Sequence, residues 1–252
     1  MTGLIPLLGA FVLGTVIGSF ANVCIFRLPR RQSLIAPASH CPQCNAAILP
    51  YQNIPILSYL LLRGRCARCR EPISIRYPLV ELLTGILFFL VYQRLGPTWE
   101  GLEAAVLLSA LVVISFIDLE HKLVPDVISL PGIVVGLLFG LLAPMNQVLD
   151  SLWGVLLGGG LFYLIALVSR GGMGGGDIKL IAMIGAFMGW KLILVTIFAA
   201  VLLGSLVAVA LLILRLKGRK DMIPFGPFLA LGAFITLFYG KAIILWYFSL
   251  LG

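Results

Sequence analysis

The 252-residue chain is 61% hydrophobic and only 11% charged, with 18 Lys and Arg against 10 Asp and Glu. This composition lies far outside the range of soluble globular domains and indicates a polytopic membrane protein. The net charge of +8 would suggest nucleic-acid binding in a soluble protein, but in a membrane protein the distribution of the basic residues matters more than their sum. We therefore expect membrane lipids, and no nucleic acid, among its partners.

Apolar runs that approach the membrane-spanning length of about 20 residues divide the chain into about eight predicted helices. No Lys or Arg precedes the first run, so it lacks the basic start of a cleavable signal peptide and is predicted to be a retained helix. Residues 178–214 are too many for one span, and we expect a break near Gly189-Trp190-Lys191. The runs cover residues 4–26, 78–95, 102–119, 126–143, 149–169, 177–190, 192–215 and 225–250.

The distribution of Lys and Arg predicts how the helices are oriented, because basic residues collect on the cytoplasmic side of a membrane. If residues 27–77 are cytoplasmic, alternation of the helices puts most of the 18 basic residues on the same side. The chain is thus predicted to be an all-α polytopic membrane protein in three parts. These are a first transmembrane helix at 1–26, a cytoplasmic insert at 27–77, and a membrane domain of about seven transmembrane helices at 78–252.

Two features of the first helix indicate contact with another helix. Gly14 and Gly18 have a spacing that allows close helix approach, although two small residues can also recur by chance. Ser19 and Asn22 lie near the cytoplasmic end of the helix and can reach one face. Asn22 is predicted to be an interhelical hydrogen-bond donor, with a contact to substrate as the alternative.

Residues 27–77 contain two Cys-x-x-Cys pairs separated by 21 residues. Each pair can supply two thiolates from one tight turn, as a tetrahedral four-cysteine zinc site requires, and Asn45 suits the left-handed conformation of such a turn. Disulfides are the alternative, but a cytoplasmic location keeps thiols reduced. We predict a structural zinc site that supplies folding energy to a segment too small for a strong core. Its ligands are Cys41, Cys44, Cys66 and Cys69.

Glu81 follows Arg76-Tyr77-Pro78 at the start of an apolar run, where Pro78 suits the first turn of a helix. A carboxylate at membrane level is costly unless it has a partner. We predict that Glu81 forms a structural ion pair with an arginine of the insert; substrate binding is the alternative.

Two acids lie at comparable depth in the predicted membrane domain. Asp118 is 15 residues after Glu103, and Asp177 is 14 residues before Lys191, which correspond to about 22 and 21 Å along a helix. If Glu103 and Lys191 mark the outer surface, both acids stop short of the cytoplasmic surface of a hydrocarbon core about 30 Å thick. Two carboxylates brought close in such a recess share a proton, and they can then activate water as aspartic proteases do.

A glycine-rich stretch precedes the second acid. Gly174, Gly175 and Gly176 have no side chains to block an extended peptide, and we predict that they bind the substrate backbone. Lys179 is predicted either to bias the ionisation of Asp177 or to pair elsewhere. A plain turn between two membrane helices is the alternative. A phosphate-binding loop is disfavoured because no strand precedes the stretch and no Gly-Lys-Ser/Thr ends it.

Further polar residues near the first acid are predicted to be structural. Asp126 follows Pro125 and suits a helix-capping or first-turn position. Glu120 and His121 are predicted to be solvated, although His121 is three residues after Asp118 and could tune it.

In this order, the motifs resemble those of the type IV prepilin peptidases, bacterial membrane aspartyl proteases of the Gly-x-Gly-Asp type. The resemblance covers most of the chain, with little motif after about Trp190. It rests on Gly18-Ser19-Phe20-Ala21-Asn22-Val23 with Arg27-Leu28-Pro29, the paired Cys-x-x-Cys motifs, Arg76-Tyr77-Pro78-Leu79-Val80-Glu81, Asp118-Leu119-Glu120 ahead of Pro125-Asp126, and Gly172-Met173-Gly174-Gly175-Gly176-Asp177-Ile178-Lys179.

The resemblance implies an enzyme of the bacterial cytoplasmic (inner) membrane that cuts the short basic leader of prepilins and pseudopilins on the cytoplasmic face. By position, Asp118 and Asp177 look like the family's catalytic pair. Many members also N-methylate the new amino terminus with S-adenosylmethionine, and the cysteine-bearing insert is typical of those bifunctional enzymes. The sequence itself has no soluble-type glycine-rich fold for that cofactor.

The charges of the insert suit this function only partly. Its arginines would repel a basic leader and are predicted to bind anionic lipid headgroups instead, whereas Glu81 or Glu120 would suit the leader. The alternative function is a proton-coupled membrane transporter or a scaffold that uses the intramembrane acids. No inverted repeat is apparent in the sequence to support a transporter.

Overall fold

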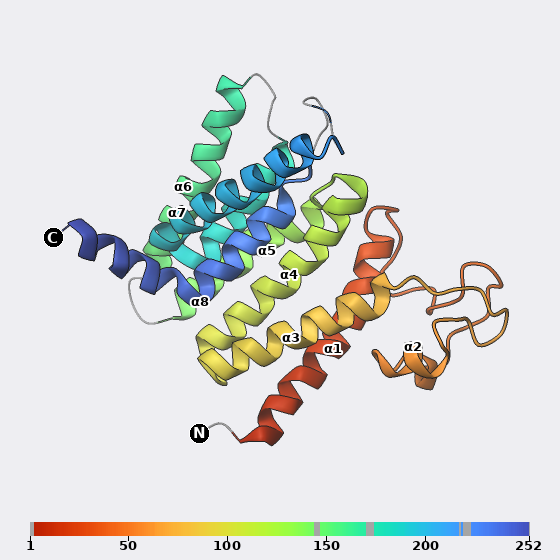
Figure 1. The fold of residues 1–252 in the computed structure, drawn as a ribbon. Helices are drawn as coiled ribbons and strands as arrows, with labels where there is room; N and C mark the ends of the chain where they lie inside the picture. Colours follow the sequence, from red (N-terminus) through yellow and green to blue (C-terminus); the bar gives the residue numbers. More distant parts are fainter. Residues whose placement is uncertain (1–2, 144–146, 170–173, 217, 219–222, 252) are drawn as a thin grey trace. The chain divides into compact units, whose positions relative to one another are not determined.

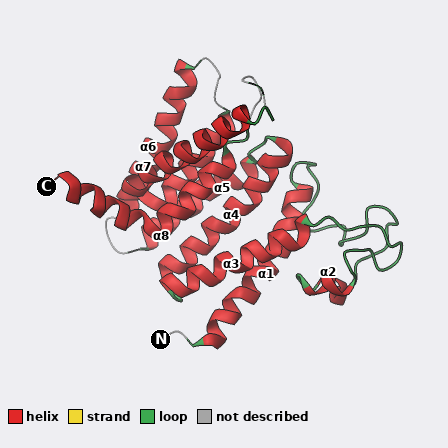
Figure 2. Cartoon of the chain, in the orientation of Figure 1, coloured by secondary structure: helices red, strands yellow, loops and turns green. Residues whose placement is uncertain are grey.

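A computed structural model describes residues 3–143, 147–169, 174–216, 218 and 223–251 of the chain. These residues form helices joined by loops, and no named strand occurs among them (Figures 1 and 2). The elements are α1 (Leu4–Arg27), a 3-10 turn (Pro50–Asn53), α2 (Leu57–Leu61), α3 (Arg76–Leu95), α4 (Trp99–His121), α5 (Asp126–Leu142), α6 (Gln147–Val168), α7 (Gly175–Ile213) and α8 (Gly226–Leu251).

The predicted all-α class is confirmed, and each predicted apolar run coincides with a helix or part of one. Among the described residues, six helices are long and apolar enough to cross a membrane, and α5 is a shorter apolar helix. The 39-residue α7 is two helices joined at Gly189, where φ is 72°. Glycine tolerates this left-handed backbone without steric cost, so the predicted break in this long run is confirmed.

The chain forms two compact units, residues 1–113 and 114–252. In the first unit, α1 packs against α3, and the insert between them consists of loops, the 3-10 turn and α2. A Cβ atom on Gly14 would lie 2.7 Å from the Thr84 carbonyl oxygen, and one on Gly18 would lie 2.8 Å from the Glu81 Cα. The two glycines therefore allow the close helix approach that their spacing predicts.

In the second unit, α7 packs against α5, α6 and α8 (Figure 1). Its first half is the most deeply buried part, with Leu180, Ile181, Met183 and Ile184 fully enclosed. A Cβ atom on Gly154 of α6 would overlap the carbonyl oxygen of Gly185 in α7. Backbone contact at these small residues fixes the position of α7, whose first turn carries Asp177.

Candidate active site and metal centre

Asp118 lies in the last turn of α4 and is only 5% exposed. Its Oδ2 atom accepts a hydrogen bond of 2.9 Å from the backbone N–H of Gly226, the first residue of α8. The first N–H groups of a helix have no partner within the helix and carry the positive end of its dipole. The start of α8 therefore both orients the Asp118 carboxyl and favours negative charge there.

Asp177 lies in the first turn of α7 and is half-buried. Its backbone N–H donates to the Gly174 carbonyl, 3.1 Å away, and this turn places the carboxyl at the N-terminal end of the helix. Asp118 lies close enough to Asp177 for the two carboxylates to repel each other when both are ionised. The structure thus brings the two predicted acids, which are 59 positions apart in the sequence, within electrostatic range of each other in one unit.

The three described glycines before Asp177 differ in their surroundings. A Cβ atom on Gly176 would lie 2.8 Å from the Cβ of Val124, in the loop between α4 and α5, so packing requires a glycine there. A Cβ atom on Gly175 would meet nothing within 4 Å, and one on the exposed Gly174 would lie 3.5 Å from Asp177 Oδ2, so a substrate can approach Asp177 past these two glycines. Gly172 and Met173 of the predicted motif lie outside the described residues.

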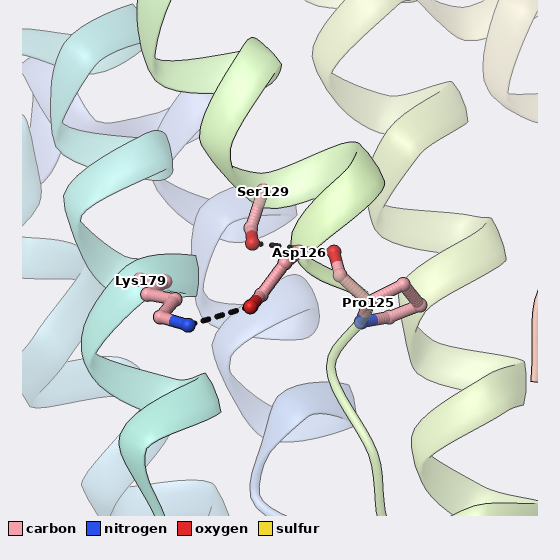
Figure 3. Close-up of polar contacts among 4 residues, drawn as sticks. All are labelled: Pro125, Asp126, Ser129 and Lys179. Carbon is pink, nitrogen blue, oxygen red and sulfur yellow. Dashed lines mark hydrogen bonds and ion pairs between the residues drawn. The ribbon is translucent and has the colours of Figure 1, made fainter.

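Lys179 pairs with Asp126 rather than with Asp177. Its Nζ atom lies 2.7 Å from Asp126 Oδ1, and the two side chains point toward each other from α7 and α5 (Figure 3). Asp126 begins α5, where a negative charge suits the helix dipole, and Ser129 completes this turn by donating to the Pro125 carbonyl. The ion pair ties the start of α5 to the start of α7.

Gly226 is a site residue that the sequence motifs did not predict. No side-chain chemistry marks it, because its contribution is a backbone N–H that every residue except proline has. One local signal was available in the sequence. The last apolar run begins with Pro224-Phe225-Gly226-Pro227, and closely spaced proline and glycine residues are typical of the first residues of a helix. A Cβ atom at this position would lie 2.8 Å from Asp118 Oδ2, so only glycine fits without displacement.

A second candidate site lies in the insert of the first unit. The Sγ atoms of Cys41, Cys44, Cys66 and Cys69 lie within 4.8 Å of one another, and the Cys41 and Cys69 sulfurs are 3.8 Å apart. Tetrahedral zinc with Zn–S bonds of about 2.3 Å needs sulfurs separated by about 3.8 Å. All four thiols are free of disulfides, so the cluster has the donor set and spacing for a structural metal.

The two Cys-x-x-Cys turns have the same backbone construction. In the first, the Asn45 N–H donates to the Cys41 carbonyl; in the second, the Arg70 N–H donates to the Cys66 carbonyl. Asn45 and Arg70 both have positive φ, 53° and 63°, as predicted for Asn45. The backbone N–H of Cys69, followed by that of Arg68, lowers the pKa of Cys66 to about 6. Hydrogen bonds to the other cysteines raise the pKa of Cys69 to about 12, so the cluster favours one thiolate among its four thiols.

Two buried charged residues attach the insert to its helices. The guanidinium of Arg27, at the end of α1, donates to the carbonyls of Ser33 and Pro37 at 2.8 and 2.6 Å. Glu81, in α3, accepts a hydrogen bond of 2.7 Å from the backbone N–H of Ile56. Within the insert, the partner of Glu81 that the structure describes is therefore a backbone N–H group. Asn22 donates to the Tyr77 carbonyl at 3.0 Å and so joins α1 to α3, the interhelical donor that was predicted.

The predicted site residues thus fall into two groups. Asp118, Asp177, the glycines and Lys179 belong to the second unit, whereas Asn22, Glu81 and the four cysteines belong to the first. The fold and these sites define a multi-pass membrane protein with a helix-borne aspartate pair and a four-cysteine insert.

Comparisons with known proteins agree with this class. Residues 12–95 match the model of the bacterial peptidase A24 N-terminal domain, and residues 105–209 match that of the type IV leader peptidase family. A prepilin leader peptidase/N-methyltransferase of Aeromonas hydrophila is 39% identical over 94% of this chain and 92% of the relative. One of the same name from Pseudomonas aeruginosa is 38% identical over 96% and 93%. No solved structure was found to match the chain.

The chain therefore belongs to the type IV leader peptidase family, as its motifs predicted.

Proposed function

We propose that this protein removes the leader of type IV prepilins or pseudopilins by aspartyl proteolysis and N-methylates the new amino terminus. The observation that carries the proteolytic half is the convergence of three helix ends: the end of α4 with Asp118, the start of α7 with Asp177, and the start of α8 with Gly226. The relatives named prepilin leader peptidase/N-methyltransferase supply the substrate class and the second activity.

In this proposal one carboxylate of the pair takes a proton from water, and the other, protonated, polarises the scissile carbonyl. The attacking water oxygen forms the new C–O bond, and the leaving amine receives a proton as the C–N bond breaks. Gly226 keeps the Asp118 carboxyl in one orientation throughout, which preorganises the site. An extended substrate backbone approaches Asp177 past Gly174 and Gly175.

The remaining assignments follow from charge and membrane physics. The insert and the aspartate pair face the cytoplasm of a bacterium, because this orientation puts the basic residues inside. Arginines of the insert bind anionic lipid headgroups, and Glu120 contacts the basic leader. The four cysteines hold a structural zinc ion that stabilises the insert.

The aspartate pair is tested by co-expressing a prepilin with the wild type, Asp118→Asn or Asp177→Asn, and determining the substrate's amino terminus by mass spectrometry. Each substitution removes a proton-transfer group, so leader removal should fall by about 10²- to 10⁴-fold. Asp126→Asn, at the start of α5, is the matched control and should slow leader removal less than about fivefold. Leader removal that persists in both active-site variants would refute the assignment and favour a transporter or scaffold.

A further inference from the structure

The first unit contains a cavity of about 1350 Å³ between the α1–α3 helix pair and the insert. We propose that this cavity binds S-adenosylmethionine, and that Glu81 and Asn22 hold the ammonium group of this methyl donor. The inference rests on the proposed N-methyltransferase function and assigns it a site. It depends on three properties of the cavity: an unused acceptor, a buried carboxylate and its size.

Asn22 supplies the unused acceptor. This residue lines the cavity, is 2% exposed, and its Oδ1 atom has no hydrogen-bond partner. The amide orientation is fixed, because Nδ2 donates to the carbonyls of Tyr77 and Gly18 at 3.0 and 3.3 Å. A flipped amide would put its oxygen against those carbonyls. A buried acceptor without a partner is destabilising, and a ligand N–H that reaches it after a small shift of neighbouring side chains would remove that cost.

Glu81 supplies a carboxylate within a lining that also contains Arg27, Arg30, Arg68 and Arg76. Its carboxylate lines the same cavity and accepts a hydrogen bond from the Ile56 N–H. A carboxylate offers about four acceptor positions, so it can accept further hydrogen bonds from a ligand. An ammonium group has three N–H donors and a positive charge, and it suits this pair of acceptors better than a neutral or anionic group does.

A guanidinium in the cavity lining suits the carboxylate of the ligand. Arg30 lines the cavity, with its guanidinium 4.1 Å from the centre of the Phe26 ring. One of its N–H groups bonds to the Phe26 carbonyl, which leaves others for the carboxylate of an amino acid. S-adenosylmethionine has an ammonium and a carboxylate on the same carbon. Ligand pockets are usually about 300–1,000 Å³, so this larger cavity has room for the cofactor and a peptide end.

Methyl transfer in this cavity needs no reagent other than the cofactor and the terminal amine. When bound, the cofactor supplies a methyl group on a sulfonium. The lone pair of the neutral terminal amine forms the N–C bond while the S–C bond breaks, and sulfur keeps the electron pair of that bond as S-adenosylhomocysteine leaves. The amine releases one proton to water. The anionic Glu81 carboxylate stabilises the positive charges that are gathered in the cavity.

The test measures ligand binding to the full-length protein in detergent, for the wild type and Glu81→Gln. Glutamine keeps an oxygen for the Ile56 N–H but loses the charge. Affinity for S-adenosylmethionine and S-adenosylhomocysteine should fall about 10- to 100-fold, as for loss of a hydrogen bond to a charged group. Affinity for 5′-methylthioadenosine, which has no ammonium group, should not change. Glu100→Gln, an exposed acid of the same unit outside the cavity lining, is the matched control.

Equal weakening of all three ligands, or of none, would overturn the proposal. A wild-type experiment keeps it testable if the variant misfolds: ultraviolet cross-linking of labelled S-adenosylmethionine should mark peptides within residues 19–81, and labelling confined to 114–252 would exclude this site. The two proposals fail differently. A wild type that cleaves prepilin but binds no S-adenosylmethionine refutes the methyltransferase function. Equal affinity for S-adenosylmethionine in the wild type and Glu81→Gln refutes only the proposed site.

Discussion

Glu81 in the first unit and Asp118 in the second each accept a hydrogen bond from a backbone N–H distant in the sequence, at Ile56 and Gly226. The elements that present these N–H groups differ. Ile56 belongs to an insert with one short α-helix, a 3-10 turn and a cysteine cluster, whereas Gly226 begins a 26-residue helix packed on α7. One carboxylate is therefore held by loops that surround a four-cysteine cluster, and the other is held by helix packing.

This difference predicts that the two activities are separable. Loss of the proposed zinc ion should disturb the geometry around Glu81 and leave the aspartate pair intact, because the described residues that hold Asp118 and Asp177 lie in the second unit. A change at the start of α8 should do the reverse.

The largest effect is expected from Cys66→Ser, because structural zinc in small domains contributes about 10–16 kcal/mol of apparent binding free energy. The variant should lose bound metal, its insert should become sensitive to protease, and methyl transfer to an already processed pilin peptide should disappear. Leader cleavage should continue. Cys24→Ala, at a buried cysteine of α1 outside the cluster, should keep the metal. If Cys66→Ser abolishes cleavage and methylation alike, the activities are not separable.

Gly226→Ala should have the opposite selectivity. The added methyl group would lie 2.8 Å from Asp118 Oδ2, so the carboxyl must move and its hydrogen bond to the helix start is weakened. A hydrogen bond to a charged group contributes about 1.5–3 kcal/mol, and cleavage should fall about 10- to 100-fold, while methylation of a processed peptide is kept. Gly160→Ala, in α6 with nothing within 4 Å of its Cβ position, is the matched control and should cleave normally.

How far the sequence predicts such a site depends on the kind of atom involved. The helix runs, the break at Gly189 and the four-cysteine cluster were predictable, because hydropathy, a glycine and two spaced Cys-x-x-Cys pairs are properties of side chains in order. Gly226 was not, because its contribution is a backbone N–H from a residue 108 positions away from Asp118. The partner of Glu81 in the insert was missed for the same reason, since any residue could have supplied the N–H of Ile56.

A third prediction separates packing from substrate binding in the glycine stretch. Gly176→Ala would place a Cβ atom 2.8 Å from the Val124 Cβ, and such overpacking costs about 1–3 kcal/mol, so the melting temperature should fall by several degrees. Gly175→Ala meets no atom within 4 Å and should keep its melting temperature, yet it should cleave several-fold more slowly if a substrate backbone occupies that space. Unchanged cleavage in Gly175→Ala would remove Gly175 from the proposed substrate site.

The smallest effect is expected at the ion pair of Lys179 and Asp126, which joins α7 to α5. The Lys179 Nζ and Asp126 Oδ1 atoms are 2.7 Å apart, but the two side chains are 39% and 56% exposed. Ion pairs with this exposure contribute about 0.2–1 kcal/mol, because water and salt screen them. Lys179→Met and Asp126→Asn should each slow cleavage less than about fivefold, and the double variant should be no worse than either, as expected when one interaction is removed twice. High salt should reduce the difference from the wild type. A loss at Lys179→Met as large as that of Asp177→Asn, with Asp126→Asn unaffected, would instead show that Lys179 acts on substrate or on Asp177 directly.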